Sequence, residues 1–115
     1  MVTMSLNEEL LWPSNAYYEQ VERLKNSIGQ PLYWVEINAS DMNGGVKLTD
    51  QPLVLLAVVD YPAPDPYRQL CPHLVILSDG RGVNLGRIAR ISRNTAFQPA
   101  AEDVLFQQHE FVQEF

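Results

Sequence analysis

Few side chains in this sequence could carry out covalent chemistry, and the clearest group is Cys71, His73 and Asp79. A thiol nucleophile, a base and an orienting carboxylate are the residue types that covalent catalysis needs. Cys71 and His73 are two residues apart, so an extended backbone would place both on one face. Pro72 distorts such a strand, however, and no glycine-rich oxyanion elbow accompanies the group. The sequence therefore favours a small buried cysteine beside a hydrogen-bonded histidine, without catalysis.

Metal binding is the second chemistry to test. Cys71 and His73 are potential zinc ligands, and His109 is the only other histidine in the chain. Known zinc sites use pairs at fixed spacing, such as CxxC or HExxH, and the sequence has neither. The stretch 41–52 contains acidic residues, but its spacing does not match a calcium-binding EF-hand loop. We therefore expect no metal and no cofactor.

Four arginines lie close together in the segment 73–93: Arg81, Arg87, Arg90 and Arg93. Within this segment Asp79-Gly80 separates two runs that contain many apolar residues, which predicts a tight hairpin turn. Pairing 73–78 with 85–92 would place the arginines on a β-ribbon, a structure that can enter the DNA major groove. The formal net charge of −6 opposes phosphate binding. Nucleic-acid contact through 73–93 is therefore only an alternative function.

Composition indicates a single globular domain over 1–115, with 46% apolar and 19% charged residues. The lone cysteine excludes an internal disulfide framework and fits a reducing compartment. No basic segment followed by an apolar one begins the chain. The longest apolar run, 53–59, is far shorter than the roughly 18 residues of a membrane-spanning helix. We expect a cytoplasmic protein without membrane insertion.

The elements that must position these residues follow from hydrophobic periodicity. Apolar side chains recur at helical spacing over 15–28, which predicts a helix, and a capping box predicts a helical turn or two within 5–12. Alternation predicts a strand over 32–38, and 46–50 reads as a short edge strand. The unbroken apolar run at 53–59 is typical of a central strand that is covered on both faces.

The C-terminal region has two interpretations. Pro99 followed by acidic residues, together with apolar side chains at helical spacing, predicts a helix over 99–113. Val104, Leu105 and Phe106 could instead pair as a strand. With the helix, the fold class is α+β: a small, mostly antiparallel sheet or half-barrel with an N-terminal and a C-terminal helix.

Because no set of residues in the sequence has the pattern of a known catalytic site, the sequence favours a non-enzymatic protein-binding module or an accessory subunit of a larger complex. Trp34 lies on the polar face of its strand, where it either covers an apolar neighbour or meets a partner. The proline-rich loop 61–67 is a stiff surface or simply a rigid connection.

Arginine and tryptophan are enriched at interface hot spots. The predicted partner-binding residues are Trp34, Arg81, Arg87, Arg90 and Arg93. A homodimer is open, and a small-molecule or enzymatic site near Asp60, Cys71 and His73 is the weakest alternative.

Overall fold

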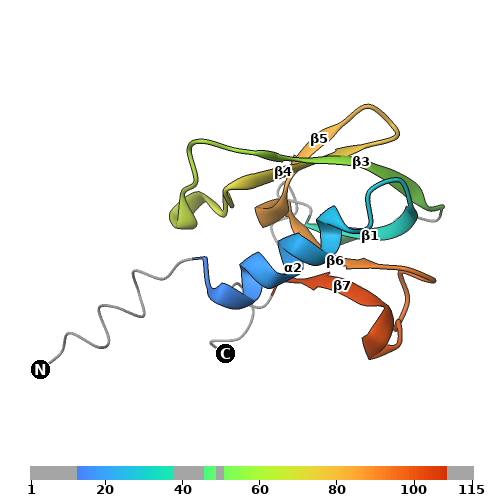
Figure 1. Ribbon diagram of the computed structural model, residues 1–115. Coiled ribbons are helices and arrows are strands. Elements are labelled where there is room, and N and C mark those ends of the chain that lie inside the picture. The colour runs from blue at the N-terminus through green and yellow to red at the C-terminus, as the bar shows by residue number, and fades with distance from the viewer. Residues whose placement is uncertain (1–12, 38–45, 49–50, 109–115) are drawn as a thin grey trace, which may run out of the picture.

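The computed structural model describes residues 13–37, 46–48 and 51–108. Within these ranges one α-helix, α2 (Asn15–Lys25), packs against an antiparallel sheet (Figure 1). The strands are β1 (Pro31–Ile37), β2 (Val46–Leu48), β3 (Leu53–Asp60), β4 (His73–Leu77), β5 (Gly82–Asn84), β6 (Ile88–Ser92) and β7 (Val104–Gln107). Their order in the sheet is β5-β4-β3-β1-β6-β7, and β2 pairs with β1. The predicted α+β class and mostly antiparallel sheet are confirmed.

The sheet has two parts because β1 changes partner along its length. Its first two residues, Pro31 and Leu32, pair with β3, and the next four residues, 33–36, pair with β6. Figure 1 shows β3, β4 and β5 above α2, and β6 and β7 below it. We name β3, β4 and β5 the upper wing, and β1, β6 and β7 the lower wing. The core lies between α2 and the sides of the two wings that face it.

The helix α2 confirms the main N-terminal prediction. Ser14 caps it, since its hydroxyl accepts a hydrogen bond from the Tyr17 amide at 3.3 Å. Tyr17, Val21 and Leu24 are buried, as their spacing predicted. The helix ends at Lys25, earlier than the expected residue 28. The helical turn predicted within 5–12 lies outside the described residues.

The C-terminal helix expected over 99–113 is wrong in the part that the structure describes. Residues 101–103 form a single 3₁₀ turn, and β7 follows and pairs with β6. A register shift in this pairing lets the adjacent Leu105 and Phe106 both be buried. The two buried neighbours hide the alternation of a regular strand, which explains the misleading helical spacing. Residues 109–113 of the expected helix are outside the described ranges.

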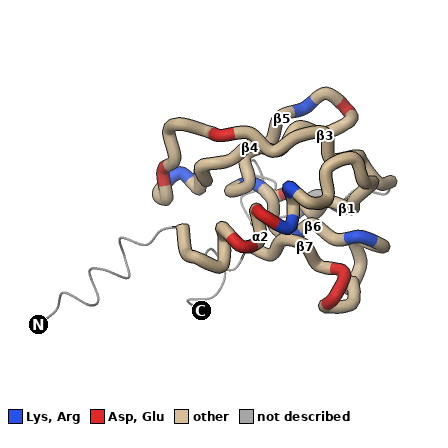
Figure 2. Tube along the Cα trace, in the orientation of Figure 1, with Lys and Arg blue, Asp and Glu red and all other residues tan. Residues whose placement is uncertain are grey.

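The segment 73–92 does not form one two-stranded ribbon. Gly80 takes a positive φ of 94° in the turn, but only β5 returns along β4. A 3₁₀ turn, Leu85–Arg87, then directs the chain away, and β6 joins the lower wing between β1 and β7. The four arginines of this segment therefore lie on different elements and not along one hairpin. Figure 2 shows Lys and Arg at several separate places along the trace.

Candidate interaction surface

The side of the upper wing that faces away from α2 carries apolar side chains. Alternate residues of β4 are buried against the core, so Leu74 and Ile76 between them point outward. Ala57 lies opposite Ile76 in the register, and Val59 lies opposite Leu74. Residues directly opposite in an antiparallel pair share a face. These four side chains therefore point to the same side of the sheet.

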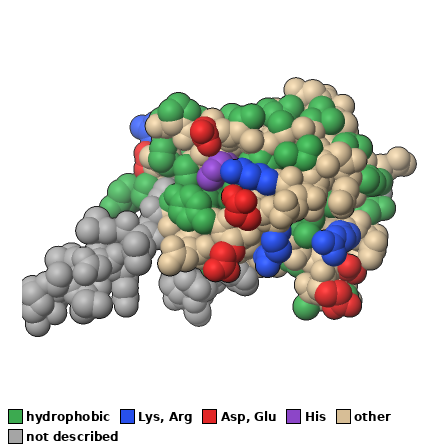
Figure 3. Space-filling view, in the orientation of Figure 1, with side chains coloured by type: hydrophobic (Ala, Val, Ile, Leu, Met, Phe, Trp, Pro, Cys, Tyr) green, Lys and Arg blue, Asp and Glu red, His purple; other side chains and the backbone are tan. Residues whose placement is uncertain are grey.

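Leu56 joins them through a strand irregularity. The register of β3 against β4 shifts between Leu55 and Ala57, as at a β-bulge. Adjacent leucines consequently have opposite environments, since Leu55 is 0% exposed and Leu56 is 51% exposed. Figure 3 shows apolar side chains along the upper side of the molecule, over the upper wing. We name this set the outer face; its members are Leu56, Ala57, Val59, Leu74 and Ile76.

The outer face corrects the prediction that the run at 53–59 is covered on both sides. The strand is central in the sheet, between β4 and β1, and Leu55 on its inner side is buried. Within the described part of the chain, Leu56 remains 51% exposed and Val59 remains 39% exposed. The physical reason is that α2, the one α-helix described, lies on the inner side only. A strand with the composition of a fully buried one thus presents one side to solvent.

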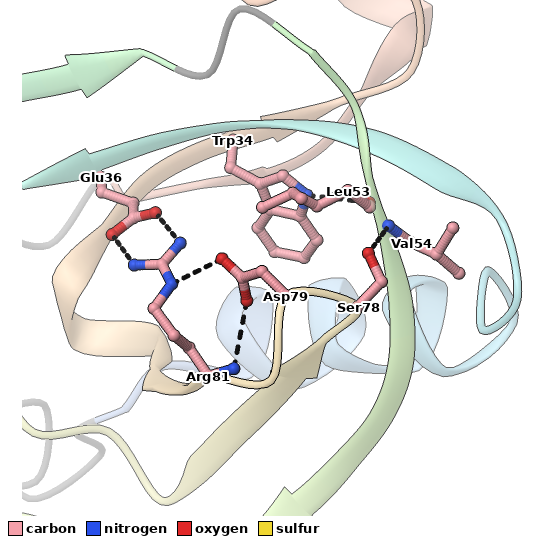
Figure 4. Close-up of polar contacts among 7 residues, drawn as sticks. All are labelled: Trp34, Glu36, Leu53, Val54, Ser78, Asp79 and Arg81. Atoms are coloured by element: carbon pink, nitrogen blue, oxygen red, sulfur yellow. Dashed lines mark hydrogen bonds and ion pairs between the residues drawn. The ribbon is translucent and has the colours of Figure 1, made fainter.

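Arg81 lies in the turn between β4 and β5, and carboxylates of the same chain hold it. Its guanidinium donates to both carboxylate oxygens of Glu36, at 2.9 and 2.7 Å, and its Nε donates to Asp79 at 2.7 Å (Figure 4). These hydrogen bonds lower the pKa of Asp79 and raise the pKa of Arg81 further above its ordinary value. Two carboxylates therefore neutralise this arginine.

Two of the other three arginines donate hydrogen bonds to backbone carbonyls in and around the lower wing. Arg90 donates to the carbonyl of Ala96 at 2.5 Å, and Arg93 donates to that of Glu102 at 3.5 Å. The Nε atoms of Arg87 and Arg90 are buried without a hydrogen-bond partner among the described residues. These contacts account for Arg90 within the fold, and a role of any of the four arginines in partner binding stays a prediction.

Trp34 takes the first of the two roles that the sequence left open. The side chain is fully buried in the core, and its Nε1 donates to the carbonyl of Leu53 at 3.1 Å (Figure 4). Trp34 is buried because it lies, with Leu32, on the side of β1 that faces α2. Tyr33 between them is half-buried. The indole ring thus packs against apolar neighbours of its own chain and offers no exposed surface.

His73 connects β4 to α2. Its Nδ1 lies 2.8 Å from the Tyr17 hydroxyl, and its Nε2 lies 3.9 Å from the carboxylate of Asp60, the residue opposite it in β3. Burial lowers the pKa of His73, the charge of Lys25 lowers it further, and Asp60 and Glu22 act in the opposite direction. The structure thus brings Asp60 and His73 together, as the weakest sequence hypothesis required.

Cys71 belongs to a separate, backbone-holding arrangement. Its side chain is buried, and its amide and carbonyl bind the Asn84 side chain at 2.7 and 2.8 Å. The same Asn84 Oδ1 accepts from the Gly86 amide at 2.7 Å. Asn84 therefore joins the segment before β4 to the 3₁₀ turn after β5. No signal in the sequence identified this role, because it depends on contacts between loops.

Acidification should destabilise the protein through His73. A folded-state pKa below the ordinary value of 6.5 means that the unfolded chain binds more protons between the two pKa values. The stabilising contribution is then complete above the unfolded pKa and is lost as pH falls through the folded pKa. We expect the melting temperature to fall from about pH 7.5 to about pH 5.5 by more in wild type than in His73→Gln. Circular-dichroism melts check this, and equal falls in both proteins would contradict it.

No protein family, curated protein or solved structure compared with the chain matches it. The helices within the described ranges lack the length and apolar character needed to cross a membrane. Among the same residues, no three His, Cys, Asp or Glu side chains are grouped so as to hold a metal ion. The candidate surface therefore rests on the geometry of the outer face.

Proposed function

We propose that the protein is a non-enzymatic protein-binding module and that a partner protein docks on the outer face. The observation that carries the proposal is Leu56, a leucine that is 51% exposed in a central strand and stands among apolar neighbours. None of the five outer-face residues is charged. Exposed Leu56 and Val59 lie beside half-buried apolar residues of the same face, an arrangement that favours an interaction site. The lone cysteine fits a cytoplasmic location for such a module.

The size of the outer face requires contacts beyond it, and the charge of the chain favours a different protein over a second copy of this chain. Strands lie about 4.8 Å apart and rise about 3.3 Å per residue, so a face two to three strands wide and five residues long covers on the order of 200 Å². A stable interface buries about 800 Å² on each partner. In addition, each copy carries a formal charge of −6, which repels another copy. A partner that also contacts the surrounding loops can reach the required area.

Nucleic-acid contact has less support than protein binding. Arg81 is neutralised by Glu36 and Asp79, and the remaining arginines are not aligned on one ribbon. A site at Asp60, Cys71 and His73 also has less support, because Cys71 is buried and Tyr17 takes one ring nitrogen of His73. Protein binding on the outer face requires neither a reactive side chain nor a cluster of positive charges.

The proposal predicts that Leu56→Asp removes partner binding and leaves the fold intact. An exposed substitution changes stability by roughly 0.5 kcal/mol, whereas a charge placed at an apolar contact costs about 2 kcal/mol or more of binding. Tagged wild type, Leu56→Asp and Phe97→Asp would be used as baits in cell extract, with quantitative mass spectrometry. Binding of the captured protein is then measured by calorimetry with purified components.

Phe97→Asp is the matched control, since Phe97 is 70% exposed but lies in the loop between β6 and β7. We expect a protein that wild type and Phe97→Asp retain and that Leu56→Asp loses. Retention by Leu56→Asp of every protein that wild type captures would show that the outer face is not the docking surface. Melting curves of all three baits verify that each is folded.

A further inference from the structure

The geometry of the outer face points to the kind of element that covers it, and we propose that this element is one amphipathic helix of the partner protein. The inference rests on the proposed function and adds the shape and chemistry of the partner. Three observations support it: the dimensions of the face, the state of the sheet edges and the absence of charge on the face.

The dimensions of the outer face match one helix. Five residues of a strand extend about 17 Å, and two to three strands are roughly 10 to 14 Å wide. A helix with its side chains is about 10 to 12 Å in diameter, and about 11 residues extend over the same 17 Å. The inner side of the upper wing already has such a cover, because α2 has 11 residues and packs through Tyr17, Val21 and Leu24. A second helix would complete a three-layer arrangement around β3 and β4.

The sheet edges are poorly suited to the main alternative, which is addition of a partner strand. At β7 the amide of Gln107 donates to the side chain of Gln20 at 2.6 Å, and the carbonyl of Leu105 accepts from Arg23 at 3.4 Å. Side chains of α2 therefore occupy groups that an added strand would use. At the opposite end of the sheet β5 is only three residues long, and so is β2, which among the described strands pairs with β1 alone. A partner therefore finds more available surface on the outer face than hydrogen-bonding groups at an edge strand.

The chemistry of the outer face determines which residues the partner helix must present in an apolar stripe along one side. Because the outer face is uncharged, the helix must present apolar residues at i, i+3 or i+4, and i+7. Leu56 is the most exposed residue of the set, so the apolar residues of the partner helix must leave room for its side chain. The chain is acidic as a whole, with a formal net charge of −6. Lysine or arginine beside the apolar stripe would therefore be favourable.

The test uses a photo-reactive benzoylphenylalanine in place of Val59, expressed in the native cells, with the same replacement at Phe97 as the control. The cross-linked segment is identified by mass spectrometry and synthesised as a peptide. Its circular dichroism is recorded alone and with purified wild type or Leu56→Asp. We expect the peptide to gain helix with wild type and to bind Leu56→Asp at least roughly 30-fold more weakly.

The outcomes separate this inference from the proposed function. A peptide that binds wild type and loses affinity for Leu56→Asp, but gains no helical signal, would overturn the helix and leave the docking surface in place. Cross-links from position 59 to a second copy of this chain would overturn both, as would cross-linking no stronger than from position 97. If the peptide gains helix with wild type but not with Leu56→Asp, the result supports both the helical partner and the docking surface.

Discussion

Leu55→Asp is expected to unfold the protein, whereas Leu56→Asp, one residue further along β3, is expected to melt close to wild type. The Leu55 side chain is 0% exposed and lies opposite Leu77, which is also fully buried. Truncating such a leucine alone costs about 2 to 5 kcal/mol, and burying an unpaired carboxylate adds several more. A domain of this size is stable by only about 5 to 15 kcal/mol.

Far-UV circular dichroism with thermal melting checks both variants in the same buffer. We expect no cooperative transition for Leu55→Asp and a shift of no more than a few degrees for Leu56→Asp. An unchanged melt for Leu55→Asp would refute the placement of this residue in the core. A large loss for Leu56→Asp would instead mean that this side chain is covered within the folded chain, which would remove the basis of the docking proposal.

This pair of leucines illustrates how far the sequence could predict the fold. The run at 53–59 correctly predicts a strand whose inner side is buried. Its continuous apolar character cannot reveal which layer covers the other side, because a helix of the same chain and a partner protein leave the same pattern. The register shift at Leu56 also cannot be recognised in the sequence, since its position depends on the pairing with β4.

Local sequence signals predict the structure correctly where local contacts decide it. Ser14, Tyr17 and Leu24 specify α2 through its cap and its apolar stripe. The path of 73–92 is decided differently, because β6 finds its partners in β1 and β7, far away in sequence. A turn signal at Asp79-Gly80 predicts a reversal of direction, but it does not determine how long the returning strand remains paired.

The polar contacts show the same limit. The bond between Tyr17 and His73 joins residues 56 positions apart, and the one between Arg81 and Glu36 joins residues 45 positions apart. Residue type suggests a function for His73 and Arg81, but only the fold shows that each has a partner within the chain. The outer face is the reverse case, since leucine and valine in a strand gave no reason to expect exposure.

Gly86→Ala is the second substitution with a large expected effect. A Cβ at this position would overlap the carbonyl oxygen of Gln69 and lie 2.6 Å from its carbonyl carbon. Both atoms belong to the backbone, so a rotamer change cannot relieve the overlap. Gln69 has a positive φ of 57°, next to a backbone bridge between Asp65 and Leu70. On the other side, the Gly86 amide is held by Asn84 at 2.7 Å.

Because both backbone segments are fixed, we expect Gly86→Ala to cost about 3 kcal/mol or more, which lowers the melting temperature by roughly 12 °C or more. Gly82→Ala is the matched control: its Cβ would lie 3.2 Å from the terminal methyl of Ile76, a flexible atom. The control should stay within about 1 kcal/mol of wild type. Equal melting temperatures for the two variants would mean that the loop around Gln69 is not packed on Gly86.

Trypsin provides a second measurement, because Arg68 precedes Gln69 and its side chain is 79% exposed. If the loop relieves the overlap by moving away, cleavage after Arg68 should be faster in Gly86→Ala than in Gly82→Ala.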